Sequence, residues 1–389
     1  MAATPGDRKA APVRGLFLGL PLYNRGMYTD QDRGFMRRAL ELAERSRLLS
    51  APNPAVGCVL VRDGRVIGEG WTQRAGANHA EIEALQDARA HGHDLRGATA
   101  YVSLEPCSHY GRTPPCASAL VEARIAKLVA AIEDPNPLVA GKGLALLRDA
   151  GIDVRCGLLA DDAREANVGF FSRMTRGRPW VRLKIAASLD GKTALANGMS
   201  QWITSEAART DGHAWRARSG AVLTGAGTVQ ADDPQLNVRL IDAPRQPLKV
   251  LVDSRLETSP QARLFSDGEV LVACAVDDAA RRAALEAVGA DVVVLPGANG
   301  KVDLAALMQE LGRRQINEVL AEAGFKLNGS LIAAGVIDEL LVYLAPMLIG
   351  EATGMAHLPA LAELAQAQRL SFRDVRPVGE DIRILARWH

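Results

Sequence analysis

The chain has 389 residues, more than one hydrophobic core usually holds, so we expect two domains. Its 46 basic and 45 acidic residues leave a net charge of +1, whereas proteins that bind nucleic-acid backbones usually carry a basic excess. The apolar runs fall short of the roughly 18 residues of a membrane span. These properties favour a small-molecule substrate, with no nucleic-acid or membrane partner.

Residues 1–28 are rich in Ala, Pro, Gly and Arg and lack periodicity, which predicts a flexible extension. Gly15 to Tyr23 is apolar and follows basic residues, as in a signal sequence, but no small-residue cleavage site comes after it. Five cysteines in a chain of this length are not a disulfide framework and indicate a reducing compartment. We therefore expect a cytoplasmic protein.

Helices and strands alternate through residues 29–175, which predicts a layered α/β domain. Asp63-Gly64 is a tight-turn dipeptide between two short apolar runs, so a hairpin is expected there. The predicted helices cover 30–50, 116–124 and 141–150, and another starts near 78–81; the predicted strands cover 56–61, 65–70, 100–104, 126–132 and 152–156.

A basic segment with Gly177 and Pro179, from Arg173 to Pro179, is a plausible domain boundary. Residues 176–389 then predict a second α/β domain with its own core. No G-x-G-x-x-G follows its first strand, so a Rossmann fold is disfavoured. The predicted strands cover 180–186, 221–224, 249–253, 270–275, 292–295, 318–322 and 339–345, and helices cover 205–218 and 304–311.

His79, Cys107 and Cys116 offer one nitrogen and two sulfur ligands, each at a predicted helix or strand end. Three protein ligands leave a fourth tetrahedral position open, as a catalytic zinc requires. Zinc lowers the pKa of its water to about 7, and Glu81 is placed to carry protons from it. H-x-E followed by P-C is a known signature of zinc deaminases. The alternative is two buried thiols and a helix-capping histidine.

The two cysteines are separated by eight residues, whereas two is the usual number in zinc deaminases. With Asn53-Pro54-Ala55-Val56-Gly57 and His79-Ala80-Glu81, the segment from Glu105 to Cys116 (EPCSHYGRTPPC) resembles the pyrimidine deaminases of riboflavin biosynthesis. The resemblance implies a cytidine-deaminase-like α/β/α domain. It also implies a diaminopyrimidinone substrate that carries a ribosylamino 5-phosphate.

Three further side chains are candidates for binding that substrate. His109 and Arg112 lie in the loop between the cysteines and can donate to a phosphate or ring carbonyl. Asn53 offers a donor and an acceptor to a pyrimidine edge, although it is also a common turn residue before proline.

Segments across 180–389 resemble the reductase domain that is fused to such deaminases. They include Lys184 to Lys192, Thr224 to Val229 and Glu322 to Ser330, the last of which reads as a strand, a glycine loop and a helix start. The resemblance implies a dihydrofolate-reductase-like fold that uses NADPH to reduce the ribose of the deaminated product to a ribityl chain. It also implies a homo-oligomer, a dimer through this domain.

The resemblance assigns functions to individual positions of the second domain. Lys184 and Glu322 are candidates for the hydride step, while Arg216 and Arg239 are candidates for binding the 5-phosphate. Arg182, Lys184 and Lys192 remain alternatives for an NADP phosphate. The cofactor positions are Ala186, Trp202, Thr228, Asp232, Ser254, Gly324, Phe325, Lys326, Leu327, Asn328, Gly329 and Ser330, and the substrate positions are Ser200, Arg216, Leu236, Arg239 and Glu322.

Two other functions are weighed against this bifunctional enzyme. A tRNA adenosine deaminase with an RNA-binding carboxyl-terminal half predicts a basic face and a short C-x-x-C, and neither is present in the sequence. A non-enzymatic scaffold with a structural zinc predicts normal folding but no turnover, either before or after the substitution Glu81→Gln.

Overall fold

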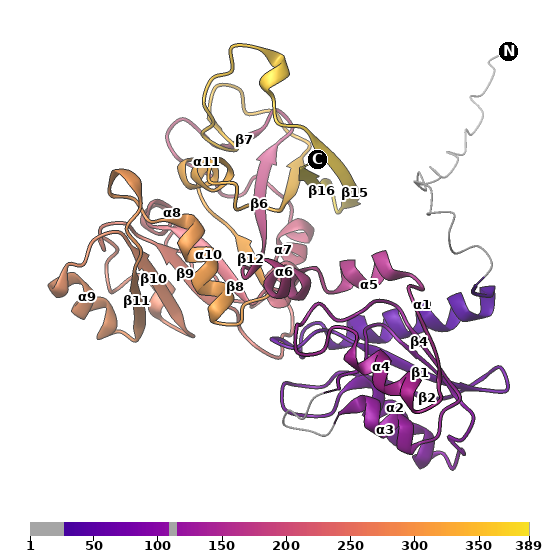
Figure 1. Cartoon of the computed structure of the whole chain (residues 1–389). Coiled ribbons are helices and arrows are strands. Elements are labelled where there is room, and N and C mark those ends of the chain that lie inside the picture. The colour runs from indigo at the N-terminus through magenta and orange to yellow at the C-terminus, as the bar shows by residue number, and fades with distance from the viewer. Residues whose placement is uncertain (1–26, 109–114, 389) are drawn as a thin grey trace, which may run out of the picture.

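The computed structural model describes residues 27–108 and 115–388, and these form two α/β bodies joined by α5 and α6 (Figure 1). The predicted His109 and Arg112 lie outside the described residues, as do residues 1–26 of the expected extension. Within the described ranges, no helix combines the length and the apolar character that crossing a membrane demands.

The amino-terminal body is built on one five-stranded sheet in the order β2-β1-β3-β4-β5. β1 is antiparallel to β2 and β3, and β3, β4 and β5 are parallel. Its strands are β1 (Gly57–Arg62), β2 (Arg65–Trp71), β3 (Thr99–Val102), β4 (Lys127–Ala130) and β5 (Asp153–Cys156), and its helices are α1 (Asp30–Ser46), α2 (Ala80–Ala90), α3 (Cys116–Glu122), α4 (Lys142–Asp149), α5 (Ala160–Ala166) and α6 (Val168–Arg176).

Glycines in the first hairpin allow helices to approach both faces of this sheet. A Cβ at Gly57 would overlap the α1 backbone at Ala39, and a Cβ at Gly68 or Gly70 would overlap the α2 backbone. Cys58 is paired with Gly70, so Gly57 faces the opposite side of the sheet from Gly70. α1 and α2 therefore cover opposite faces, which makes three layers.

The carboxyl-terminal body is built on a nine-stranded sheet, β11-β10-β9-β8-β12-β6-β13-β16-β15. In this spatial order, each strand from β11 through β13 is parallel to its neighbour. β16 is antiparallel to β13, and β15 is antiparallel to β16. The strands of this body are β6 (Trp180–Ser188), β7 (Lys192–Ala194), β8 (Ala221–Gly225), β9 (Leu248–Val252), β10 (Val270–Cys274), β11 (Ala290–Val294), β12 (Glu318–Ala321), β13 (Glu339–Ala345), β14 (Thr353–Gly354), β15 (Leu370–Val378) and β16 (Asp381–Trp388), and the helices are α7 (Glu206–Arg218), α8 (Ala226–Asp232), α9 (Ala279–Glu286), α10 (Leu304–Arg313) and α11 (Phe325–Ala333).

Most predicted elements lie within a few residues of the observed ones, because their apolar periodicity matches their burial. Within the expected boundary segment, Arg173 to Arg176 belongs to α6, and the chain leaves the helix at Gly177, with φ 69°. The β15–β16 hairpin was not predicted, because much of β15 is exposed and lacks an apolar run.

Candidate active sites

Three predicted metal ligands come together in the amino-terminal body. His79 caps the start of α2, Cys107 follows β3, and Cys116 is the first residue of α3. The His79 Nδ1 atom lies 3.6 Å from Cys107 Sγ and 3.4 Å from Cys116 Sγ. One nitrogen and two sulfurs so close together fit zinc and leave its fourth position open.

The shifted pKa values in this cluster favour an ionised Cys107 thiol and a Glu81 carboxyl that can be protonated near neutral pH. Hydrogen bonds from Cys116 and His79 lower the pKa of Cys107, and its Sγ accepts the Cys116 backbone N–H at 3.3 Å. Glu81 is 4% exposed, and burial raises its pKa to about 7. Cys58 is fully buried, and burial raises its pKa, which favours the neutral thiol.

Glu105 holds the segment that carries Cys107 in place, a structural function that was not predicted from the sequence. Its buried carboxylate accepts backbone N–H bonds from Asp134 at 3.1 Å, Gly141 at 2.9 Å, Gly143 at 2.9 Å and Leu144 at 3.2 Å. These bonds tie the loop before α4 to the residue two positions before Cys107. The adjacent P-C dipeptide was the only local signal for this function.

In the carboxyl-terminal body, Glu322 follows β12 and lies between two cations. Arg216 of α7 holds it with a two-pronged contact, Nε to Oε1 at 2.5 Å and Nη2 to Oε2 at 3.0 Å. Lys184 of β6 approaches Oε2 at 3.8 Å. Although burial opposes ionisation, the charges of Arg216 and Lys184 lower the pKa of Glu322 to about 2. The carboxyl group is therefore ionised.

Asn237 and His213 connect Arg216 and its partner Glu322 to Arg239. Arg216 Nη1 donates to the Asn237 carbonyl at 3.0 Å, and Arg239 Nη1 donates to the Asn237 side-chain oxygen at 3.0 Å. The Arg239 backbone N–H donates to His213 Nδ1 at 3.1 Å. Burial and nearby arginines lower the pKa of His213 to about 4, so this imidazole is neutral. His213 and Asn237 had no sequence signal beyond their position beside Arg216 and Arg239.

The predicted glycine loop forms the start of α11. Gly324 is its N-cap and has no side chain with which to cap the helix. The first N–H groups of a helix lack partners within the helix and can bind an anion. A Cβ at Gly324 would lie 3.3 Å from the Thr228 hydroxyl, and one at Gly225 would lie 2.8 Å from Leu327 Cδ2. The starts of α8 and α11 therefore lie together at the carboxyl ends of β8 and β12, where parallel sheets bind ligands.

Within α11, side chains hold the following segment in place. Asn328 Nδ2 donates to the Met355 carbonyl at 2.8 Å, and the Phe325 ring meets His357 edge to face at 5.3 Å. A Cβ at Gly329 would overlap the His357 carbonyl oxygen. Lys326 and Ser330 are exposed on the same helix.

The other predicted cofactor and substrate positions lie around the edge of the sheet at which β8 and β12 end. Ala186 shares a face of β6 with Lys184. Trp202 is 65% exposed and lies 4.5 Å from the Arg209 guanidinium carbon, and Ser200 donates to Asp232 at 3.4 Å.

Ser254 follows β9 and accepts the Val302 N–H at 3.3 Å. Leu236 is buried with φ 55°, a left-handed conformation that is uncommon for a branched residue. It directs the chain toward Asn237 and Arg239.

Arg182 is not available to an NADP phosphate, which corrects one of the three alternatives. Its guanidinium is 2% exposed and forms ion pairs with Glu318 and Glu339. Lys184 pairs with Glu322, and Lys192 lies on β7 and is half-buried.

Asn53 lies in the turn before β1. There it lines a cavity between the two bodies.

A zinc-site α/β/α body joined to a parallel-sheet body with a glycine-loop anion site defines a two-domain deaminase–reductase. Residues 29–132 match the cytidine and deoxycytidylate deaminase zinc-binding region, and residues 179–384 match the RibD C-terminal domain. The chain belongs to the family of the riboflavin biosynthesis protein RibD.

The relatives align along almost their whole length. RibD of Escherichia coli (strain K12) is 47% identical over 366 residues, which cover 90% of this chain and 98% of that protein. The structure of Acinetobacter baumannii RibD, form 1, is 44% identical, covers 92% of this chain and 99% of its own, and has a TM-score of 0.84. A Thermotoga maritima structure described as a diaminohydroxyphosphoribosylaminopyrimidine deaminase/5-amino-6-(5-phosphoribosylamino)uracil reductase is 32% identical, covers 92% and 99%, and has a TM-score of 0.83.

These matches confirm the predicted fold class, a cytidine-deaminase-like domain followed by a dihydrofolate-reductase-like domain. The chain is a bifunctional deaminase and reductase of riboflavin biosynthesis, which acts on a small molecule. Its deaminase domain binds zinc and its reductase domain uses NADPH.

Proposed function

We propose that the amino-terminal domain deaminates 2,5-diamino-6-(5-phosphoribosylamino)pyrimidin-4(3H)-one and that the carboxyl-terminal domain reduces the ribosyl chain of the resulting 5-amino-6-(5-phosphoribosylamino)uracil. The observation that carries the proposal is the convergence of His79, Cys107 and Cys116 next to the buried Glu81. The description of the Thermotoga maritima relative supports these two substrates.

In the deaminase step, His79, Cys107 and Cys116 would hold the zinc, which supplies a water of lowered pKa when it is bound. Glu81 would accept one proton from the attacking water and pass it to the ring nitrogen. It would then carry the second proton, released as the new hydroxyl becomes a carbonyl, to the amine, which leaves as ammonia. Burial suits Glu81 to this function, because it brings the carboxyl pKa to about 7. We assign Asn53 to the pyrimidine edge, and His109 and Arg112, outside the described residues, to the phosphate or ring carbonyl.

In the reductase step, bound NADPH supplies the hydride. Lys184 is the proton donor we assign to the sugar oxygen or ring nitrogen, and burial lowers its pKa, which eases that donation. The ionised Glu322 positions Lys184 and Arg216, and Arg216 and Arg239 bind the 5-phosphate. Ser200 and Leu236 complete the substrate positions.

We place the cofactor along the edge formed by β6, β8, β9 and α11. The open N-terminus of α11 would receive the pyrophosphate. The assigned residues are Ala186, Trp202, Thr228, Asp232, Ser254, Gly324, Phe325, Lys326, Leu327, Asn328, Gly329 and Ser330.

We also propose the division of the chain and its assembly. Residues 29–175 would be the deaminase domain and 176–389 the reductase domain, after an extension of residues 1–28. A homodimer through the reductase domain is supported by exposed apolar residues of the terminal hairpin: Phe372, Val375 and Ile382. All five cysteines are free, which supports a cytoplasmic location.

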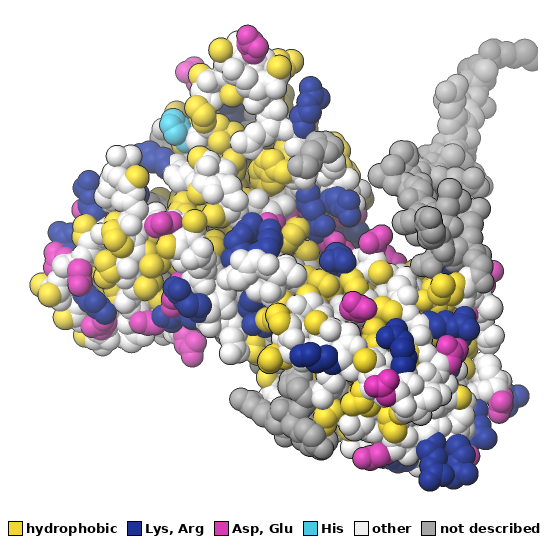
Figure 2. Space-filling model, viewed as in Figure 1, with side chains coloured by type: hydrophobic (Ala, Val, Ile, Leu, Met, Phe, Trp, Pro, Cys, Tyr) yellow, Lys and Arg dark blue, Asp and Glu magenta, His cyan; other side chains and the backbone are white. Residues whose placement is uncertain are grey.

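The surface favours this function over a nucleic-acid base deaminase. Figure 2 shows acidic and basic side chains interspersed over the visible face, whereas RNA binding calls for a basic stripe. Inosine formation in purified tRNA would overturn this choice.

The proposed proton carrier is tested by Glu81→Gln. Glutamine keeps the size of the side chain but cannot take a proton, so ammonia release should fall by about 10²–10⁴-fold while zinc content stays unchanged. Metal analysis and an ammonia assay on the full chain measure both quantities. Glu83→Gln, on the same helix, is the matched control and should retain activity. Deamination at the normal rate by Glu81→Gln would refute the assignment.

A further inference from the structure

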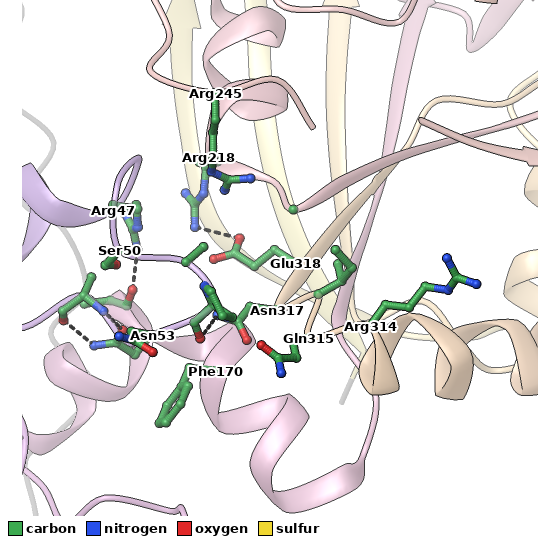
Figure 3. A pocket seen from close by; sticks show the side chains of 17 residues that line it. Arg47, Ser50, Asn53, Phe170, Arg218, Arg245, Arg314, Gln315, Asn317 and Glu318 are labelled. Carbon is green, nitrogen blue, oxygen red and sulfur yellow. Dashed lines mark hydrogen bonds and ion pairs between the residues drawn. The ribbon is translucent and has the colours of Figure 1, made fainter. Parts of the chain in front are cut away.

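A cavity of about 230 Å³ lies between the two domains; its lining includes Asn53 but neither the zinc ligands nor Glu322. Its walls are the turn after α1, the α5–α6 junction, the end of α7 and the segment between α10 and β12 (Figure 3). Both domains therefore contribute to this one space.

The charged lining of the cavity is predominantly cationic. Arg47, Arg218, Arg245 and Arg314 line it, and Glu318 is its one lining carboxylate. The Arg314 guanidinium points away from the others in Figure 3 and pairs with Asp291 at 2.6 Å and Glu310 at 2.8 Å. Of the other three arginines, Arg47 pairs with Glu44 at 2.6 Å and Arg218 pairs with Glu318 at 3.2 Å, whereas Arg245 forms no ion pair within the described residues.

These three arginines carry buried N–H groups that have no partner within the described residues. The unpaired atoms are Nε of Arg47, Nε of Arg218, and both Nε and Nη2 of Arg245. A buried donor without a partner costs about 1–3 kcal/mol, and native proteins rarely leave several at one place. Four such groups around one cavity indicate a missing acceptor.

Glu318 does not neutralise this charge. It is shared between Arg182, with which it forms a close ion pair, and Arg218 Nη2 at 3.2 Å. Burial, and to a smaller extent the charge of Arg182, lowers the pKa of Arg218 to about 9, although Glu318 opposes this shift. In the part of the chain that the structure describes, Arg245 forms no ion pair, and it lines the same cavity as Arg218 (Figure 3).

We propose that this interdomain cavity is a binding site for the phosphate group of a small phosphorylated molecule. A phosphate offers several acceptor oxygens and up to two negative charges, which match converging guanidinium N–H groups better than a single carboxylate does. Since the arginines come from both domains, the bound phosphate bridges the domains. The site goes beyond the proposed function: it shares Asn53 with the proposed substrate-binding residues but none of the assigned catalytic residues.

Calorimetric titration of the full chain with inorganic phosphate tests this site, with Arg245→Gln as the variant. We expect the variant to lose one bound phosphate per chain, or to bind it at least about tenfold more weakly. Arg282→Gln is the matched control, because Arg282 pairs with Glu286 on the distant α9, and it should bind like the unmodified chain. Identical isotherms for Arg245→Gln and the unmodified chain would overturn the proposal.

Thermal unfolding supplies a second measurement that does not depend on calorimetric heat. Without phosphate, Arg245→Gln should leave Tm unchanged or raise it, because it removes an unpaired buried cation. With phosphate, only chains that retain Arg245 should gain stability through this site. An equal phosphate-induced rise in Tm for Arg245→Gln would contradict the site.

Two ligands distinguish the source of the phosphate. Tighter binding of ribose 5-phosphate than of inorganic phosphate, lost in Arg245→Gln, assigns the site to a phosphate monoester. The reverse order assigns it to the free ion. Ribose alone should not bind, and Arg245-dependent ribose binding would refute phosphate recognition.

Discussion

Arg216 is the side chain on which most of the reductase site converges. Its guanidinium contacts both oxygens of Glu322 and the carbonyl of Asn237, so it is held rigid before any substrate arrives. A rigid fork loses little conformational entropy when it binds a phosphate. The same geometry explains why Glu322 is ionised.

Arg216→Ala is expected to raise the reductase KM for the phosphorylated substrate by about tenfold or more, since a charge-assisted contact is lost. Steady-state NADPH consumption measures it. Arg216→Lys keeps the charge without the fork and should give an intermediate KM. An unchanged KM in the alanine variant would remove Arg216 from the phosphate site.

His213 makes stability depend on pH. Its pKa is about 4 in the folded protein and near 6.5 in the unfolded chain, so the unfolded chain binds more protons between these values. Its contribution is present above pH 6.5 and is lost as pH falls toward 4. Protonation would also break the bond in which Nδ1 accepts the Arg239 N–H.

Between pH 7 and pH 5, the unmodified protein should lose about 2 kcal/mol more of its free energy of unfolding than His213→Gln does. Denaturant unfolding of the reductase domain at both pH values measures this difference. Equal losses in the two proteins would show that His213 is not held neutral.

At the scale of elements, both sites are built where a strand ends and a helix begins. His79 precedes α2, Cys116 opens α3, and the glycine loop opens α11. Helix starts expose N–H groups, and strand ends deliver side chains to one edge of a sheet. The start of α4 likewise exposes backbone N–H groups, and the Glu105 carboxylate accepts hydrogen bonds from them.

Gly329→Ala should weaken NADPH binding by about tenfold, because the new Cβ would overlap the His357 carbonyl and push α11 away from its packed position. Fluorescence titration with NADPH measures the affinity.

Gly212→Ala in α7 is the matched control for that substitution. Apart from its chain neighbours and the nearby backbone of α7 itself, no described atom lies within 4 Å of the position of its Cβ, and alanine favours a helix. NADPH affinity that is equal in the Gly329 variant and the unmodified chain would contradict the close packing of α11.

At the scale of the whole molecule, the two domains have separate cores. One buried cluster runs from Tyr28 to Phe171, and two others lie between Val181 and Tyr343. Polar contacts connect the domains, among them Asn317 Nδ2 to the Pro52 carbonyl at 3.0 Å and Arg387 to Glu165 at 2.5 Å. Separate cores with a polar interface are typical of domains that function independently.

Cys107→Ser should abolish zinc binding and destabilise the deaminase domain, while reduction of supplied deaminated substrate continues. Metal analysis, ammonia release and NADPH consumption on the same preparation test this separation. Cys274→Ser, which changes a buried thiol of the reductase core, is the control for loss of a cysteine and should keep its zinc. Loss of reduction in Cys107→Ser would mean that the two sites are not separate.

The zinc-dependent deaminase site could be predicted from the sequence alone, because its residues lie close together along the chain. His79 and Glu81 lie on one helix start, and the eight residues between Cys107 and Cys116 distinguish the family, so local order was sufficient. The alternation of helices and strands was likewise predictable from apolar periodicity.

Which charged side chains form ion pairs could be learned only from the tertiary structure. Arg182 and Lys184 are two residues apart on one strand, yet Arg182 is buried against Glu318 and Glu339 whereas Lys184 reaches Glu322. The partners are more than 130 residues away along the chain, and no local pattern encodes such contacts. The arginine-lined cavity is the extreme case, because two separately folded domains must dock before its unpaired donors face one another.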